Sequence, residues 1–307
     1  MRVAVVGTGS FAKHYINELP VAGHEVVVLT RSHKEFLDDK KWGPVEQRIT
    51  DYSSVPQLVE LLSDCDALVS TISDLSQTYV DVHMALIAAC KQTPKCKRFI
   101  PSGYGGNAED FREGPSSLFH HNAVVRDALL AQTELEWTAV CIGWIMDHVV
   151  PSGNRIHSDA GPVFPLDLHT RAITIPGSGN DAFTMTSVRD LAKAVAQLLE
   201  SPEKWRPYTF VQGEETTWLK LAKVMKTTGD MPDLKISFES LDHIRDQKKD
   251  SFFAVLTTEV KLFVPSGAFK FDQAKVQRDR AEFFPNVHFR TVTELVETAK
   301  KDANAIV

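Results

Sequence analysis

The sequence has few of the features that mark secreted, membrane or metal-binding proteins. Its 307 residues include only four cysteines, and these show neither CxxC spacing nor histidines at metal-finger intervals. This pattern excludes a disulfide framework and predicts free thiols in a reducing compartment. No apolar run approaches the roughly 20 residues of a membrane span. HExxH and GxSxG motifs are also missing, so we expect no bound metal and no serine nucleophile.

Basic residues do not outnumber acidic residues in this chain. With 34 basic and 40 acidic side chains the formal net charge is −6, so we expect no nucleic-acid partner. An apolar content of 43% excludes a disordered chain. Because Met1 and Arg2 run directly into an apolar stretch, we expect no signal peptide and a cytosolic location. The expected partner is a small-molecule substrate, without a membrane, and the expected assembly is a monomer or a homodimer.

Short apolar runs alternate with helical patterns through the first half of the chain. Apolar strands buried on both faces and separated by helices are typical of a parallel sheet with crossover helices. We therefore predict the α/β fold class, with a doubly wound parallel sheet of the Rossmann type. The expected strands are 3–6, 26–29, 67–69, 99–100 and 137–142, and the expected helices are 10–19, 54–62, 77–90 and 117–132.

The composition of the sequence changes after about residue 150. Prolines and glycines accumulate up to residue 180, a strong helical pattern follows at 187–199, and a strand is expected at 207–211. The remainder is mainly helical and polar. We predict a Rossmann domain over 1–150, to which 184–212 return, and a smaller, discontinuous C-terminal substrate lobe from 151–183 and 213–307.

A glycine-rich turn follows the first apolar run. Such a GxGxxA turn between a strand and a helix is the dinucleotide fingerprint, in which the backbone approaches a pyrophosphate at the helix N-terminus. A tight turn that merely needs glycine is the alternative. The predicted cofactor-binding residues of this loop are Gly7, Thr8, Gly9, Ser10, Phe11 and Ala12.

The residue after the second expected strand indicates which dinucleotide binds. NAD-type sites place an acid there, which accepts hydrogen bonds from the ribose. This chain has Arg31 instead, with Lys40 among the nearby donors. A guanidinium suits a 2′-phosphate, so we predict NADP(H) as the cofactor. The alternative is that Arg31 is an ordinary surface residue.

Several segments together resemble one family over nearly the full length. Besides the glycine turn, Arg98-Phe99-Ile100-Pro101-Ser102-Gly103-Tyr104-Gly105 is similar to a discriminating segment of the NmrA-like and isoflavone reductase-like branch of the atypical short-chain dehydrogenases/reductases. The resemblance implies an NADPH-dependent reductase of a small aromatic or conjugated carbonyl or olefin in specialised (secondary) metabolism. It also implies nicotinamide-side residues at Ile72, Ser73, Ser102, Gly103 and Tyr104. The implied substrate residues are Tyr104, Trp144, Met146 and Asp147.

Two departures concern the proton donor. No tyrosine has a lysine four residues later, which excludes the usual YxxxK relay, and Asn122 stands where the resemblance implies a lysine. Asparagine cannot act as a general acid. We expect Asn122 to hydrogen-bond substrate or nicotinamide, or else to be a core residue bonded to backbone. His121 and Tyr104 are the further catalytic candidates.

The missing lysine leaves two other functions open. One is a non-catalytic NADP(H)-binding redox sensor, as in the regulatory members of the family. The other is a cofactor-bound scaffold for a non-redox step such as isomerisation or cyclisation.

Overall fold

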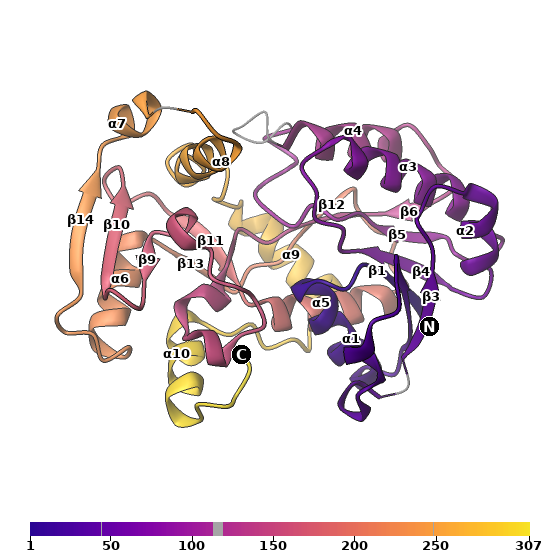
Figure 1. Cartoon of the computed structure of the whole chain (residues 1–307), viewed down its shortest axis with the longest axis horizontal. Helices are drawn as coiled ribbons and strands as arrows, with labels where there is room; N and C mark the ends of the chain where they lie inside the picture. Colours follow the sequence, from indigo (N-terminus) through magenta and orange to yellow (C-terminus); the bar gives the residue numbers. More distant parts are fainter. Residues whose placement is uncertain (44, 113–118, 248) are drawn as a thin grey trace.

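The computed structural model describes residues 1–307 except residue 44, residues 113–118 and residue 248, and it does not describe the side chain of Lys40. The chain forms two lobes side by side (Figure 1), with the indigo and purple N-terminal part at the right and the orange part at the left. In the described part of the chain, no helix is both long enough and apolar enough to cross a membrane.

Six parallel strands form the sheet of the first lobe, in the order β3-β2-β1-β4-β5-β6. This order confirms the predicted doubly wound α/β fold. The order reverses between β1 and β4, so the carboxyl ends of these two strands frame the crevice in which such sheets bind ligands. The strands are β1 (Arg2–Val6), β2 (Glu25–Thr30), β3 (Glu46–Ile49), β4 (Ala67–Ser70), β5 (Arg98–Ile100) and β6 (Glu136–Trp137).

The apolar run of β1 is explained by burial on both faces of the sheet. Val3 and Val5 contribute to a core that includes side chains of α1 and α5, whereas Ala4 and Val6 contribute to a second core under α2, α3 and α4. All four side chains are fully buried. Burying a valine stabilises a fold by roughly 1.5–3 kcal/mol, so a central strand favours unbroken apolar sequence.

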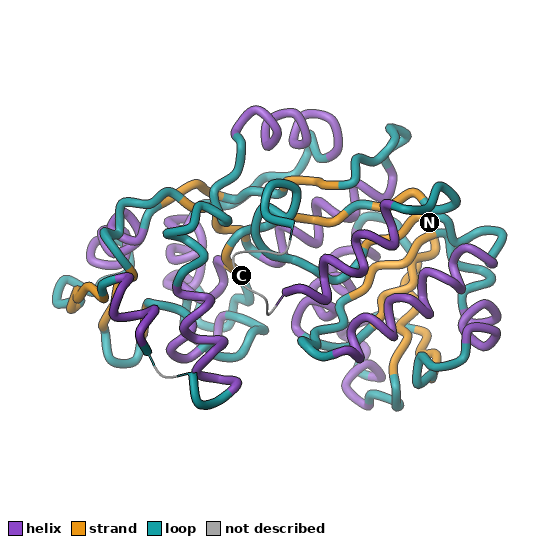
Figure 2. The backbone as a smooth tube through the Cα atoms, turned by 90° about the horizontal axis from the view of Figure 1, so that it is seen from above, coloured by secondary structure: helices purple, strands orange, loops and turns teal. Residues whose placement is uncertain are grey.

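Helices cover both faces of this sheet. Helices α1 and α5 pack against each other, and α3 packs against both α2 and α4; Figure 2 shows helices flanking the orange strands of this lobe. Ser54 and Ser76 cap α2 and α3 by accepting backbone N–H groups. The helices are α1 (Ser10–Val21), α2 (Val55–Leu61), α3 (Gln77–Gln92), α4 (His120–Leu130) and α5 (Val188–Glu200).

Some element boundaries differ from the sequence prediction. Helix α1 continues through Pro20 to Val21, because a proline in the last turn removes only one of the final hydrogen bonds. The expected strand 137–142 is two strands, β6 paired with β5 and β7 (Ala139–Cys141) paired with β12 (Tyr208–Phe210). The expected start of α4 at residue 117 lies outside the described residues.

Two small sheets and most of the remaining helices lie beyond the six-stranded sheet, and the second small sheet contains strands from both predicted domains. Strand β10 (Ala172–Pro176) lies between β14 (Lys235–Glu239) and β9 (Leu166–Asp167), and β11 (Phe183–Thr186) lies between β8 (Trp144–Ile145) and β13 (Glu214–Thr216). Their core includes Trp218, whose ring centroid lies 4.3 Å from that of Phe183. The helices here are α6 (Trp218–Thr227), α7 (Leu241–Asp246), α8 (Phe252–Lys261), α9 (Gln273–Phe283) and α10 (Val292–Lys301).

Residues 184–212 lie largely against the first lobe. Helix α5 packs on α1, and β12 pairs in parallel with β7. These contacts support the domain division expected from the sequence, which we keep as a proposal: a Rossmann domain over 1–150 with 184–212, and a smaller lobe from 151–183 and 213–307.

Candidate active site

The glycine turn joins β1 directly to α1, as the sequence predicts. Gly7 has a φ of +103°, and a Cβ at this position would lie 2.7 Å from Thr71 Oγ1. Glycine is therefore required here both for the backbone conformation and for the close approach of β4. Ala12 is fully buried against the same core.

Gly9 is the N-cap of α1 and faces open space. A Cβ built at this position would meet no atom within 4 Å, apart from those of its chain neighbours, and no side chain caps the helix. The first N–H groups of an α-helix lack intrahelical acceptors and carry the positive end of its dipole. This exposed helix start therefore offers the backbone cradle that a pyrophosphate requires, with Thr8, Ser10 and Phe11 around it.

Arg31 follows the last residue of β2 and is exposed. Its side chain makes no hydrogen bond or ion pair to any residue that the structure describes. The neighbouring Lys34 Nζ donates to Ser32 Oγ over 2.9 Å. Lys40, also expected to contact the cofactor, begins the short 3-10 helix Lys40–Trp42. Its side chain is not described by the structure. The guanidinium of Arg31 is thus available to an anion beside the adenosine end of the site.

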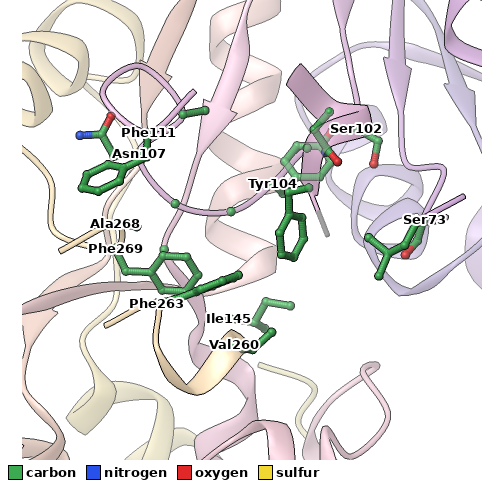
Figure 3. A pocket seen from close by; sticks show the side chains of 18 of the residues that line it. Ser73, Ser102, Tyr104, Asn107, Phe111, Ile145, Val260, Phe263, Ala268 and Phe269 are labelled. Carbon is green, nitrogen blue, oxygen red and sulfur yellow. The ribbon is translucent and has the colours of Figure 1, made fainter. Parts of the chain in front are cut away.

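A cavity of about 320 Å³ opens at the carboxyl ends of β4 and β5. One side consists of strand ends and their loops, including Ser73, Ser102 and Tyr104, and the other side is apolar (Figure 3). The predicted residues Phe11, Ile72, Ser73, Ser102, Gly103, Tyr104, Asn122 and Trp144 all line this cavity. The apolar wall also contains Phe111, Phe119, Val260, Phe263 and Phe269, which come mainly from the second lobe.

Tyr104 contributes a ring rather than a free hydroxyl. The ring stacks on Phe11 with centroids 4.9 Å apart, and the hydroxyl donates to the Ser70 carbonyl over 3.1 Å. Burial raises the pKa of this hydroxyl above its usual range. The structure therefore supports Tyr104 as part of a flat floor beneath the substrate better than as a proton donor.

Helix α3 supports the Ser102–Gly103 backbone through two side chains that sequence reasoning missed. The Tyr79 hydroxyl donates to the Ser102 carbonyl and accepts from Asn122 Nδ2 over 3.3 Å. Ser102 N in turn donates to His83 Nε2 over 3.3 Å, while His83 Nδ1 donates to the Tyr79 carbonyl over 2.8 Å. Tyr79 and His83 are one helical turn apart, and this i, i+4 spacing is the only signal the sequence offered.

The structure separates the other predicted residues from one another. His121 is half-buried and is not among the described residues that line the cavity; its Nδ1 lies 3.1 Å from the carbonyl of Leu75, which does line it. Met146 and Asp147 were expected in the substrate cleft, but the described wall ends at Ile145. Both are fully buried in a 3-10 helix, Met146–Val149, that turns into the protein. Met146 packs in the core that contains Trp218 and Phe183, and Asp147 Oδ2 accepts from Val188 N over 3.0 Å.

Arg126 is a further residue that the sequence did not indicate. It lies one turn after Asn122 on α4, is only 7% exposed and lines the cavity. One of its terminal nitrogens donates to the Arg112 carbonyl, whereas Nε has no hydrogen-bond partner among the described residues. A buried guanidinium with an unused donor is costly unless a ligand completes it.

The network around His83 predicts a loss of stability in mild acid. Burial lowers the pKa of His83 to about 4, against about 6.5 in an unfolded chain. Between these values the unfolded state binds more protons, so stability falls as the pH falls below about 6.5 and stops falling near pH 4. The added proton at Nε2 would also face the Ser102 N–H. We expect His83 to account for roughly 2 kcal/mol of lost stability between pH 7 and pH 5.

Denaturant unfolding of the wild type and of His83→Gln at both pH values checks this prediction. Other buried histidines contribute to the wild-type slope, so the difference between the two proteins isolates His83. Equal losses in both proteins would contradict the prediction.

Comparison with known proteins places this arrangement in a family. A family model described as NAD(P)H-binding matches residues 7–202. The oxidoreductase swnR of Arthroderma benhamiae is 38% identical over 309 residues, covering 100% of both chains. An isoflavone reductase homolog A622-like protein of Nicotiana tabacum is 23% identical over 305 residues and 94% of each chain.

Solved structures agree on the fold. The structure described as AtPrR2 with NADP+ and (+)pinoresinol has a TM-score of 0.80 at 21% identity, covering 97% of this chain and 98% of that one. The predictions of the family, of an oxidoreductase and of a nicotinamide dinucleotide as cofactor are therefore confirmed. The chain belongs to the NAD(P)H-binding family, and its relatives in that family include the oxidoreductase swnR.

Proposed function

We propose that the protein is an NADPH-dependent reductase of a small, largely apolar substrate with an aromatic or conjugated carbonyl or olefin group. The observation that carries the proposal is the position of the cavity. Its aromatic wall, with Phe263 and Phe269, faces the ends of β4 and β5, and Phe11 of the Gly7–Ala12 loop also lines it. A flat apolar substrate would be held there with water excluded.

The residues present fit an NADP(H) molecule. The open helix start at Gly9 would hold the pyrophosphate, and Arg31, with Lys40 as a further candidate, would contact the 2′-phosphate. Ile72, Ser73, Ser102 and Gly103 would lie along the nicotinamide side. When bound, the reduced nicotinamide supplies the hydride, so the chain's own task is to position the substrate and manage its charge.

Arg126 and Asn122 are the groups that we assign to the reacting oxygen. Arg126 Nε is a buried, unused donor, and the Asn122 amide lies on the same helix face one turn earlier. Donors held in place before the reaction stabilise the charge that develops on a substrate oxygen. Because arginine stays protonated, this arrangement supplies a hydrogen bond rather than a proton. Solvent, or His121 beside the cavity-lining Leu75, then delivers the proton.

Arg126→Met is expected to lower kcat/KM by about 30-fold, because a hydrogen bond to a charged group contributes roughly 1.5–3 kcal/mol. Methionine keeps the length of the buried stem, so packing should change little. NADPH affinity should stay at the wild-type value. Steady-state kinetics with saturating NADPH and a varied concentration of a conjugated carbonyl compound measure the effect, and an unchanged kcat/KM would contradict the role of Arg126.

Asn122→Ala is expected to lower kcat/KM about tenfold, in line with the loss of one neutral hydrogen bond. It also frees the Tyr79 hydroxyl, so a thermal unfolding curve should accompany the kinetics. His121→Ala is the matched comparison on the neighbouring position. If both variants keep full kcat/KM, this face of α4 does not contribute to the reaction.

One experiment separates the reductase from the two alternatives that Asn122 leaves open. The purified protein is incubated with NADPH and a panel of conjugated carbonyl compounds, while the absorbance of the reduced nicotinamide and the products are followed. Consumption of NADPH matched by a reduced product supports the reductase. Binding without consumption points to a redox sensor, and a product without consumption points to a scaffold for a non-redox step. The cytosolic location and a role in secondary metabolism stay predictions from the sequence.

A further inference from the structure

Three buried side chains that the proposed reaction does not use meet behind the cofactor loop. His14 lies on α1, Asp147 lies in the 3-10 helix Met146–Val149, and His157 lies in the loop that follows. One nitrogen of each ring and one carboxylate oxygen lie within 4.8 Å of one another. The two imidazole rings are stacked, with centroids 5.7 Å apart.

The polar atoms of this cluster have no partners among the described residues. His14 and Asp147 are 0% exposed and His157 is 8% exposed. Both nitrogens of each histidine and Oδ1 of Asp147 lack a hydrogen bond within the described part of the chain. His14 Nε2 lies 3.9 Å from Asp147 Oδ1, which is too far for a hydrogen bond. Burying such groups without a partner costs roughly 1–3 kcal/mol each, and more for a carboxylate.

We propose that this cluster binds a divalent transition-metal cation, with Zn²⁺ as the best match, through His14, Asp147 and His157. Two imidazole nitrogens and a carboxylate oxygen are ligands that Zn²⁺ accepts at about 2.0–2.2 Å. Tetrahedral coordination at that length brings ligand atoms to about 3.4 Å from one another. Side-chain rotation that closes each present separation by about 1.4 Å or less satisfies this geometry.

The surroundings orient the carboxylate and balance the nearby positive charges. Oδ2 of Asp147 accepts from Val188 N, which leaves Oδ1 directed at the histidines. Three cations face the cluster. Arg189 is paired with Glu18 at 3.2 Å, Arg290 with Asp190 at 2.9 Å, and Arg155, beside His157, with Asp159. A fixed second partner for a ligand is typical of metal sites.

A cation at this site would link α1 to the segment that contains residues 147 and 157. The described cysteines are free, so they form no disulfide between these two parts. Helix α1 begins with the cofactor loop, and residues 147 and 157 lead into the smaller lobe. A bound cation would thus hold the start of that lobe against the dinucleotide loop. The sequence suggested no metal because the ligands come from three separate segments rather than from a spaced motif.

Metal binding by the full chain tests the proposal directly. Protein stripped with a chelator is titrated with ZnCl₂ by calorimetry, and with CoCl₂ while visible d–d absorption is followed. We expect one cation per chain, cobalt bands of a low-symmetry site, and a higher Tm in the presence of Zn²⁺. His157→Ala should weaken binding at least about 100-fold and remove the cobalt bands. His169→Ala, at an exposed histidine outside the cluster, should leave both unchanged.

Two results would overturn the proposal. One is a wild type that binds no Zn²⁺ or Co²⁺ at this stoichiometry. The other is a folded His157→Ala that binds as the wild type does, since exposed histidines would then be the ligands. If His157→Ala fails to fold, His14→Gln is measured in the same way. These readouts do not require turnover, so they are independent of the proposed reductase activity.

Discussion

Gly9→Asp is expected to abolish dinucleotide binding while the fold keeps its stability. The backbone of Gly9 has φ −72°, which any residue adopts, and no atom lies within 4 Å of a Cβ placed there other than its chain neighbours. An aspartate N-cap is also favourable for a helix. In the complex, however, its carboxylate would lie against the pyrophosphate, and like charges in contact cost several kcal/mol. We expect NADPH affinity to fall on the order of 1,000-fold.

Gly7→Ala is the matched control at the other glycine of the loop. Its Cβ would lie 2.7 Å from Thr71 Oγ1 at a φ of +103°, so this variant should lower Tm as well as affinity. Calorimetric titration with NADPH and thermal unfolding of the wild type and both variants measure the two effects separately. Wild-type affinity in a stably folded Gly9→Asp would show that the pyrophosphate binds elsewhere.

The contrast between the two glycines illustrates what sequence alone could predict. Strand β1, the turn and α1 are consecutive, and each is encoded by local chemistry: an unbroken apolar run, a glycine with positive φ, and a helical pattern. The parallel sheet with right-handed crossovers then follows from the alternation of strands and helices. Strand β3 was missed because Glu46–Ile49 is a half-exposed edge strand with charged side chains, and edge strands need no apolar signal.

The support around the cavity could not be predicted in the same way. Tyr79, His83 and Ser102 meet only because α3 crosses behind the end of β5, and no spacing in the sequence encodes that crossing. Arg126 reads as an ordinary helix-surface residue until its burial beside the cavity is known. Met146 and Asp147 were misplaced because the resemblance indicated the segment that reaches the cavity but not the inward turn of the 3-10 helix that follows β8.

Arg31→Glu is expected to weaken NADPH binding on the order of 100-fold and to leave NADH binding equal or tighter. Arg31 directly follows β2, where NAD-type sites carry an acid that accepts hydrogen bonds from the ribose. The substitution removes a charge-assisted pair with the 2′-phosphate, which contributes roughly 1.5–3 kcal/mol, and adds a repulsive charge. Arg31→Ala removes only the charge-assisted pair, so we expect NADPH affinity to fall about 10-fold to 100-fold in that variant.

The ratio of the NADPH affinity to the NADH affinity shows whether Arg31 recognises the 2′-phosphate or only adds general positive charge. Arg245→Ala removes an exposed arginine of α7 in the other lobe, so NADPH binding should not change. The Arg31 effect should also shrink as salt is added, because the pair is exposed and screened. Should wild-type protein bind NADH as tightly as NADPH, or Arg31→Ala leave NADPH binding intact, the 2′-phosphate would have to be recognised by other side chains.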